Sequence, residues 1–255
     1  MFYVDQFAYH SRLRKLHPME KFLFTLITLG ICLAEKNPLV HFMVILIMLG
    51  LLKIKAGIPG RILMRLIFLP MAFLIVGVVT IAISFSGVSE GMAAWVKLGG
   101  YYFGVSQSGL RNAGLVFLQS LSSVTCLYFL ALTMPMVELI YVLRLCKIPV
   151  VVTELMIIIY RFIFVFIETA FHIYTAQSSR WGYYSFKRSV NSFGILFANL
   201  WGKAFYKSQA LFRSLISRGY EKEIRVLDPQ YHFSFAGIAA FFAVDLILII
   251  VACTI

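Results

Sequence analysis

Residues 66–85 read LIFLPMAFLIVGVVTIAISF, a run of 20 residues without a charged side chain. A helix needs about 20 apolar residues to cross the hydrocarbon core of a bilayer. A helix also hydrogen-bonds its own backbone, as lipid requires of any segment that it surrounds. This run therefore predicts a transmembrane α-helix.

Four further apolar runs raise the expected number of transmembrane helices to about five. They cover residues 22–34, 39–52, 110–133 and 233–255. The first two are short for a span, so we expect a helical hairpin whose polar ends reach the interface. Residues 86–107 are rich in Gly, Ser and aromatic residues. We expect them to form a polar loop, with room for a helix lying at the interface.

The overall composition also favours a membrane protein. Hydrophobic residues make up 61% of the chain, whereas soluble domains contain roughly 45–50%. The 23 Lys and Arg residues exceed the 11 Asp and Glu residues, for a net charge of +12. Such an excess suits nucleic acid, an acidic partner or the cytoplasmic loops of a membrane protein. Because the charges fall between apolar runs, we favour the lipid bilayer and expect no nucleic-acid partner.

Residues 134–228 differ from the rest, because they stay apolar but carry charges throughout. A charge at the bilayer centre costs about 2.5–3.5 kcal/mol on insertion scales, so we do not expect this segment to span. Three amphipathic cytoplasmic helices fit it instead. They cover residues 135–146, 150–181 and 189–219. Gly182 and Gly219 are expected to end the second and third helices, as C-cap glycines often do.

The expected fold is therefore an all-α integral membrane protein with about five transmembrane helices and a cytoplasmic coupling domain of three. The expected domains are residues 1–133 (four spans), 134–228 (the cytoplasmic helices) and 229–255 (the last span). With the N-terminus inside, three of the 23 basic residues fall outside, namely Lys36, Lys97 and Arg111. This asymmetry follows the positive-inside rule, so we expect a multi-pass protein with a cytoplasmic N-terminus.

A search for catalytic or metal-binding patterns finds none in the sequence. There is no G-x-x-x-x-G-K-[ST] phosphate loop, no H-E-x-x-H and no G-x-S-x-G. The five histidines lack the i, i+4 pairing of a metal site, and the four cysteines form no C-x-x-C pair. We therefore expect no catalytic residue, metal site or cofactor in this chain. Asp245, alone in the last apolar run, is either a packing carboxylate or part of a proton relay.

The most distinctive feature is a near-repeat, which reads SRWGY from Ser179 and SRGY from Ser217. Each copy closes a predicted long amphipathic helix, and the arginines are 38 positions apart (180 to 218). Taken singly, each copy is an ordinary helix end, where Arg suits the dipole and Gly the cap. Two matching copies favour a second interpretation, in which Arg180 and Arg218 dock two similar partner surfaces. The planar guanidinium suits this role because it pairs bidentately with a carboxylate.

At these residues the sequence resembles the transmembrane coupling (T) component of energy-coupling factor (ECF) transporters. That family carries two Ala-Arg-Gly-like motifs at the ends of two long coupling helices. The corresponding residues are Ser179, Arg180, Trp181, Ser217, Arg218 and Gly219. Neither copy has the alanine, and Trp181 stands in place of the first glycine. Further residues are similar to the cobalt/nickel (CbiQ) type. They are Asp5, Ala8, Tyr9, Ser11, Arg14, Leu16, His17, Pro18 and Lys21, then Tyr160, Arg161, Phe162, Glu168 and Ala176.

The resemblance implies a non-catalytic subunit of an ATP-driven cobalt importer in a bacterial or archaeal inner (plasma) membrane. Two cytoplasmic ATP-binding-cassette (ABC) ATPase subunits would bind ATP, and Arg180 and Arg218 would each dock in a groove of one of them. A separate membrane subunit, with or without a small accessory membrane subunit, would hold the cobalt. The coupling helices would transmit ATPase movements to that substrate-binding subunit.

Three alternatives stay open at the level of sequence. Nickel is an alternative substrate, because nickel and cobalt systems share this type of T component. A stand-alone secondary transporter would use Asp245, Glu168 and His172 as an ion relay, although the chain lacks the two similar halves with broken helices typical of that class. A membrane enzyme with its active site in residues 134–228 lacks a nucleophile–base or metal spacing.

Overall fold

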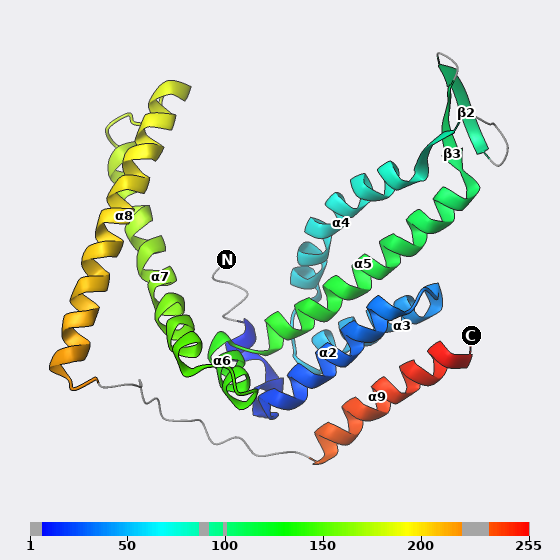
Figure 1. Cartoon of the computed structure of the whole chain (residues 1–255), viewed down its shortest axis with the longest axis horizontal. Coiled ribbons are helices and arrows are strands. Elements are labelled where there is room, and N and C mark those ends of the chain that lie inside the picture. The colour runs from blue at the N-terminus through cyan, green and yellow to red at the C-terminus, as the bar shows by residue number, and fades with distance from the viewer. Residues whose placement is uncertain (1–6, 87–91, 99–100, 221–234, 255) are drawn as a thin grey trace. The chain divides into compact units, whose positions relative to one another are not determined.

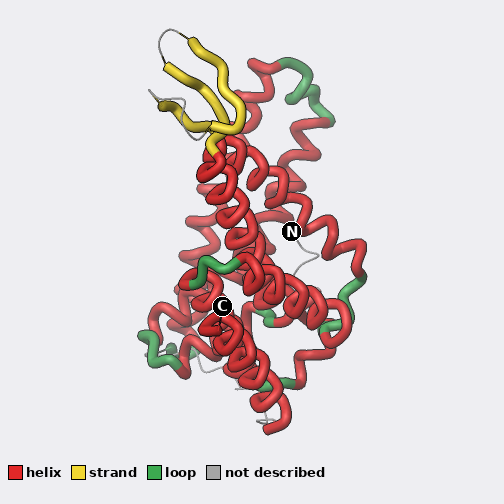
Figure 2. The backbone as a smooth tube through the Cα atoms, turned by 90° about the vertical axis from the view of Figure 1, so that its right-hand side faces the viewer, coloured by secondary structure: helices red, strands yellow, loops and turns green. Residues whose placement is uncertain are grey.

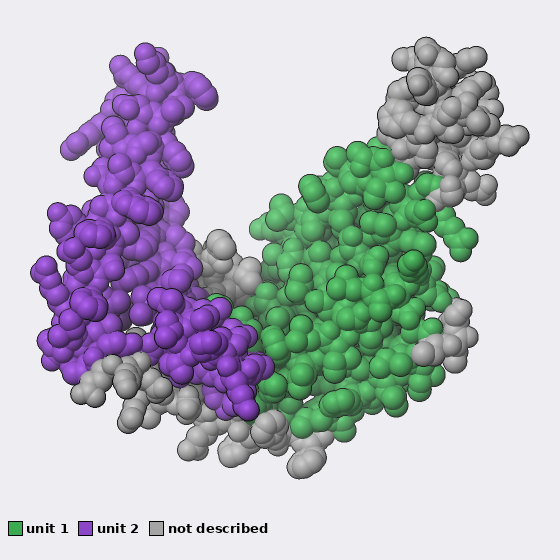
Figure 3. All heavy atoms as spheres, viewed as in Figure 1, with its two compact units in different colours: residues 1–139, 230–255 green, residues 140–229 purple. Residues whose placement is uncertain are grey.

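The computed structural model describes residues 7–86, 92–98, 101–220 and 235–254 (Figure 1). Helices predominate among them (Figure 2). The chain forms two compact units, coloured separately in Figure 3. Unit 1 comprises Met1–Leu139 and Gln230–Ile255, and unit 2 comprises Ile140–Pro229. The domain boundary expected between residues 228 and 229 lies outside the described residues.

Unit 1 contains the five helices that the sequence predicts as spans. They are α2 (Pro18–Ala34), α3 (Pro38–Gly50), α4 (Gly60–Ala82), α5 (Gln107–Thr133) and α9 (Phe235–Thr254). A short 3-10 helix, η1 (Arg12–Lys15), precedes α2, and α3 continues into one turn of π-helix, η2 (Leu51–Lys55). These helices confirm the predicted all-α membrane class.

A small antiparallel sheet lies between α4 and α5 in the sequence, where we expected a polar loop or an interfacial helix. Its strands are β1 (Ile83–Ser86), β2 (Met92–Leu98) and β3 (Tyr101–Ser106), in the order β1-β3-β2. Ile83 pairs with Val105, and Leu98 pairs with Tyr101. The loop prediction is therefore wrong for these residues. Aromatic and β-branched residues favour strands, and a Gly-Gly pair between two such runs is a hairpin signal.

The core of unit 1 forms where α2, α3, α5 and α9 pack together. Phe24 of α2 stacks its ring on Phe241 (centroids 4.5 Å apart) and meets Phe129 edge-on (5.6 Å). Cys32 and Cys126 are buried free thiols in the same core, as expected of cysteines that act as small apolar residues. Helices α2, α5 and α9, which come from distant parts of the sequence, thus share one apolar centre.

The outer surface of α4 suits lipid. This helix packs against α5 and exposes large apolar side chains elsewhere, such as Phe68 (72% exposed) and Phe73 (78%). Among the described residues, four helical stretches are long and apolar enough to cross a membrane. They are Pro38–Lys55, Gly60–Ile81, Gly109–Thr133 and Val150–Ser178, and Gly237–Ala252 is a shorter apolar stretch. Several spans are thus available in unit 1.

Unit 2 contains α7 (Val150–Ser178) and α8 (Phe186–Ser217), and α6 (Met136–Leu145) leads into it from unit 1. These bounds agree with the three predicted amphipathic helices to within three residues. On length and composition, α7 also qualifies as a membrane span. This property was not expected, because the charges throughout residues 134–228 predict a segment outside the bilayer.

A buried ion pair joins α2 to the start of α6 within unit 1. The ammonium of Lys21 lies 2.7 Å from Glu138 Oε2, and the two side chains are 0% and 4% exposed. The same ammonium donates a hydrogen bond to the carbonyl of Thr133 at the end of α5 (3.2 Å). Burial raises the pKa of the Glu138 carboxyl, and the charge of Lys21 opposes that rise. Lys21 therefore holds α2, α5 and α6 together through one charged group.

Asp245 has a packing role in unit 1. The hydroxyl of Thr28 donates to Asp245 Oδ1 (2.9 Å), and Asp245 is 3% exposed, so the contact joins α2 to α9. Glu168 and His172, the other members of the possible ion relay, lie on α7 of unit 2 and are largely exposed. Neither unit by itself assembles the relay, and the packing interpretation of Asp245 is the one that its contacts support.

Replacing Lys21 with Met should lower the free energy of unfolding by about 3–5 kcal/mol, because it leaves Glu138 buried without its counter-charge. The double variant Lys21→Met, Glu138→Leu should recover most of that loss, since neither charge remains. Thermal and chemical unfolding of the detergent-solubilised protein measures both. The exposed Glu168–His172 contact provides the control, and His172→Ala should change stability by less than about 0.5 kcal/mol. Equal losses in the single and double variants would contradict the pairing.

Candidate functional site

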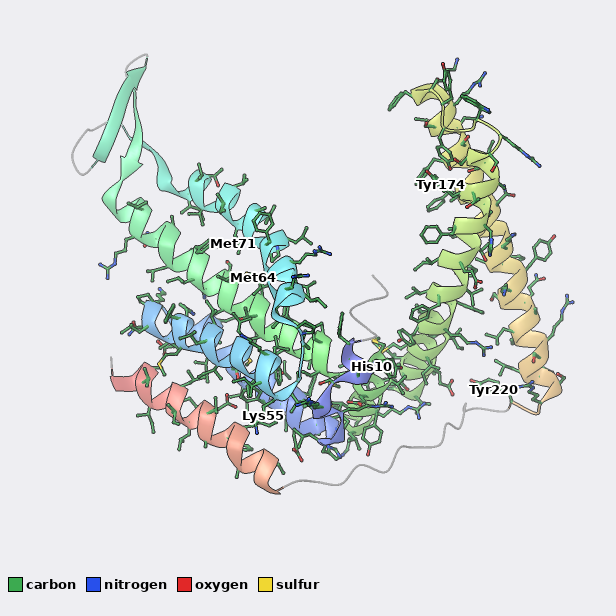
Figure 4. The ribbon with its side chains drawn as sticks, turned by 180° about the vertical axis from the view of Figure 1, so that it is seen from behind. His10, Lys55, Met64, Met71, Tyr174 and Tyr220 are labelled. Atoms are coloured by element: carbon green, nitrogen blue, oxygen red, sulfur yellow. The ribbon has the colours of Figure 1, made fainter. Side chains whose placement is uncertain are left out.

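The near-repeat lies at the two ends of a hairpin that α7 and α8 form. The side-chain amide of Gln177 donates to the carbonyl of Ser192 near one end (3.0 Å). The hydroxyl of Tyr220 donates to Glu154 Oε2 near the other end (2.8 Å). The two helices therefore run antiparallel. Figure 4 shows the hairpin with Tyr174 near one end and Tyr220 at the other.

Arg180 and Arg218 lie at opposite ends of this hairpin. Arg180 follows the end of α7, and Arg218 follows the end of α8. The 32 residues of α8 separate the two positions by roughly 48 Å, at about 1.5 Å per residue. The predicted docking site therefore consists of two separate positions, one at each end of the hairpin.

The end of α8 is closed by a Schellman motif next to Arg218. Gly219 has a left-handed backbone (φ +72°), and its N–H donates to the carbonyl of Ile216 (3.0 Å). The N–H of Tyr220 donates to the carbonyl of Leu215 (3.0 Å). These two bonds satisfy carbonyls that the helix itself leaves unpaired. The prediction of a C-terminal glycine at position 219 is confirmed.

The end of α7 has the same pair of hydrogen bonds, with Trp181 as its left-handed residue. Trp181 has φ +59°, and its N–H donates to the carbonyl of Ser178 (3.1 Å). The N–H of Gly182 donates to the carbonyl of Gln177 (2.9 Å). Arg180 therefore immediately precedes the left-handed residue, as its counterpart does at the end of α8. The prediction of Gly182 as the capping glycine is wrong by one position.

Close packing explains why glycine stands at 182 and not at 181. A Cβ on Gly182 would lie 2.8 Å from the carbonyl oxygen of Gln177 and 2.9 Å from Ser192 Oγ, closer than real Cβ contacts. The glycine is therefore needed where α8 approaches the turn. Trp181 then has to adopt the left-handed conformation, which costs a non-glycine residue about 1–2 kcal/mol.

Gln177 organises the Arg180 end. Its Oε1 accepts a hydrogen bond from the hydroxyl of Tyr183 (2.7 Å), while its amide donates to Ser192 on α8. The hydroxyl of Ser192 donates in turn to the carbonyl of Gly182 (2.9 Å). This network fixes the turn that carries Arg180 to both long helices.

The tyrosine of each copy anchors its end of the hairpin. Tyr183 bonds to Gln177, and Tyr220 bonds to Glu154, so both phenols donate to a side chain of α7. Both tyrosines belong to the near-repeat, but their anchoring role was not predicted from the sequence. Their acceptors carry no local signal, because Glu154 lies 66 positions from Tyr220.

The predicted docking side chains face outward at both ends. Arg180 and Arg218 are exposed, and within the described ranges neither guanidinium has a hydrogen-bond or ion-pair partner. The hydroxyls of Ser179 and Ser217 donate to carbonyls of their own helices, four and three residues earlier. The arginines, and not the serines, are therefore the groups available to a partner.

The surface that carries these ends is positive. Residues 179–219 contain seven Lys or Arg residues and no Asp or Glu. A free guanidinium in such a field favours a partner that presents carboxylates, to which it can make two parallel charge-assisted hydrogen bonds. In the part of the chain that the structure describes, no three His, Cys, Asp or Glu side chains gather as metal ligands would.

Comparison with known proteins identifies the family. A family model described as CbiQ, cobalt transport protein, matches residues 10–230. The chain belongs to the CbiQ family of cobalt transport proteins. The family resemblance drawn from the near-repeat and the N-terminal segment is thereby confirmed. CbiQ is a family of transport proteins and not a known enzyme family. The several long apolar helices of this CbiQ chain make it an integral membrane protein.

Relatives match nearly the whole of this CbiQ chain. An uncharacterized protein of Methanocaldococcus jannaschii is 33% identical over 98% of this chain and 92% of its own length. The cobalt transport protein CbiQ of Salmonella typhimurium is 28% identical over 88% of this chain and 99% of its own length. A putative fused cobalt transport protein, CbiMQ, of Methanocorpusculum labreanum is 30% identical over 96% of this chain but only 41% of its own length.

The substitution Gly182→Ala should destabilise unit 2 by about 1–3 kcal/mol, because the new methyl group overpacks against Gln177 and Ser192. Hydrogen exchange of amides near the end of α7, together with thermal unfolding, measures the loss. Gly202→Ala is the matched control on α8, since a Cβ there meets nothing within 4 Å. It should stabilise the helix by about 0.5–1 kcal/mol. Equal changes in stability in the two variants would show that the turn at Gly182 has room for a Cβ.

Proposed function

We propose that this CbiQ-family chain is the transmembrane coupling subunit of an ATP-driven, ECF-type cobalt importer. The observation that carries the proposal is the pair Arg180 and Arg218, each beside a left-handed residue, at opposite ends of one hairpin. Their separation of roughly 48 Å exceeds the diameter of a small domain, about 30 Å. Two contacts that far apart suit two partner subunits better than one, and a pair of ABC ATPases provides two.

Each arginine docks in an acidic groove of one cytoplasmic ATPase in this proposal. ATP binds the ATPases and draws them together. Because the Tyr183–Gln177 and Tyr220–Glu154 hydrogen bonds hold both ends to α7, the movement is passed along the hairpin and is not absorbed by a loose turn. The coupling subunit itself binds neither ATP nor another cofactor, and it performs no chemistry.

The apolar face of α8 is the proposed contact for the substrate-binding membrane subunit. Phe193, Phe197, Trp201 and Phe205 recur at every fourth position and are 60–75% exposed. Side chains at this spacing lie on one face of a helix, and an exposed apolar face of this size marks a protein contact. The fused CbiMQ protein of M. labreanum supports a second membrane component, because this chain matches less than half of it. Cobalt, and any small accessory membrane subunit, belong to that side of the complex.

We place unit 2, with the N-terminus, on the cytoplasmic side of the inner (plasma) membrane. Glu154, Arg161 and Glu168 are spread along α7, and charges at mid-bilayer are costly. If α7 instead crossed the membrane, Arg180 would lie on the opposite side from Arg218. Both arginines can reach cytoplasmic ATPases only when α7 stays outside the bilayer.

Reversing both charges (Arg180→Glu, Arg218→Glu) should abolish ATP-driven cobalt uptake while the protein remains in the membrane. Each substitution sets a carboxylate against an acidic groove, and the loss of a buried charge partner costs at least about 2 kcal/mol, or roughly 30-fold in affinity. Co-purification with the ATPases and cobalt uptake by the complex in vesicles are the measurements. Lys203→Glu, an exposed charge reversal in the middle of α8, should leave both near normal.

Normal co-purification and uptake by the double variant would overturn the coupling proposal. Uptake by the chain alone in vesicles, driven by an ion gradient without ATPases, would favour a secondary transporter. Nickel accumulation in place of cobalt would leave the coupling role intact and correct the substrate.

A further inference from the structure

The two ends of the hairpin differ at their left-handed residue. Gly219 fills this position after α8, where a positive φ carries no steric penalty. Trp181 fills it after α7, at φ +59°. A bulky residue held in a sparsely populated backbone region is a reason to look for a function that it serves.

Trp181 makes few side-chain contacts within its own chain that would offset the strain in its backbone. Its side chain is 67% exposed, and its ring meets the ring of Tyr184 edge-on with centroids 5.4 Å apart. Tyr184 is itself 72% exposed. Two large aromatic side chains therefore stand together on the surface beside Arg180, outside any core.

We propose that Trp181 and Tyr184 form an aromatic anchor that packs on the same ATPase subunit that receives Arg180. Trp, Tyr and Arg are the residues that most often dominate the binding free energy of an interface, and all three types occur within residues 180–184. The partner surface is an apolar pocket beside an acidic groove. This inference rests on the proposed function, which supplies the identity of the partner.

The anchor makes the two ends of the hairpin unequal. At the Arg218 end, Gly219 adds no side chain at the position that Trp181 fills at the other end, so that end lacks the aromatic anchor. The left-handed backbone sets the direction of the Cα–Cβ bond of Trp181, and the edge-on contact with Tyr184 holds its indole beside Arg180, as a shaped protein pocket requires. A fluid lipid interface, which also attracts Trp and Tyr, makes no such demand. The two ATPase contacts should therefore differ in their sensitivity to substitution.

The experiment measures ATPase binding and stability in parallel. The full chain is reconstituted in nanodiscs of phosphatidylglycerol and phosphatidylcholine, and the ABC ATPase subunits encoded by the same genome are titrated onto it. Trp181→Gly should raise the Tm of the chain alone, because it removes the backbone strain, and should weaken ATPase binding about tenfold or more. Trp181→Ala should weaken binding as much without raising the Tm. Tyr206→Ala, which removes an exposed aromatic side chain from α8, should leave ATPase binding unchanged.

Two results would overturn this inference alone. One is unchanged ATPase binding by Trp181→Gly while Arg180→Glu loses binding. The other is strong quenching of Trp181 fluorescence by brominated phospholipids in the ATPase-bound complex, in a variant whose other two tryptophans are Phe, since it would place the indole in the membrane. Normal ATPase binding by Arg180→Glu would instead overturn the proposed function, and this inference with it.

Discussion

Large contiguous apolar surfaces are covered by lipid or by protein, and the positions of charges decide which of the two can cover them. In unit 1 the buried ammonium of Lys21 pairs with Glu138, and the buried carboxyl of Asp245 accepts a hydrogen bond from Thr28. With these groups satisfied inside, the outer face of α4 is left for lipid. In unit 2 most charges, such as Arg161 and Glu168 on α7 and Lys203 on α8, stay exposed, so the apolar face of α8 suits a protein partner. In the proposed assembly, hydrophobicity thus has two different roles in one chain.

The ends of the long helices then decide where the proposed docking groups lie. The last carbonyls of a helix need donors, and α7 and α8 obtain them through the same pair of backbone hydrogen bonds. Arg180 and Arg218 precede the left-handed residue in each case, and a tyrosine beyond it bonds back to α7. An exposed arginine on a loose turn would bind a partner without transmitting movement. In the proposed coupling role, each arginine is fixed to a helix of about thirty residues and therefore passes movement of the partner on to that helix.

The predictable parts of the structure depend on local patterns. Long apolar runs predicted the five apolar helices α2, α3, α4, α5 and α9 of unit 1, and the Ser-Arg near-repeat predicted that Arg180 and Arg218 lie at the ends of two long helices. The unpredicted parts depend on neighbours that are distant in sequence. Trp181 becomes the left-handed residue because Gly182 has to pass close to Ser192, which is ten positions away. The bond from Tyr220 to Glu154 crosses 66 positions. The small sheet was missed because aromatic and Gly-rich composition suits loops and hairpins alike.

The central claim is that both arginine ends face the cytoplasm, and the reactivity of single cysteines tests it most directly. Ser179→Cys and Ser217→Cys are introduced one at a time into a chain whose four native cysteines are replaced. A membrane-impermeant maleimide is then applied to inside-out and right-side-out vesicles. The account predicts that both positions react in inside-out vesicles alone, and that bound ATPases protect both. Reaction of Ser179→Cys in right-side-out vesicles alone, as a membrane-spanning α7 would require, would contradict it.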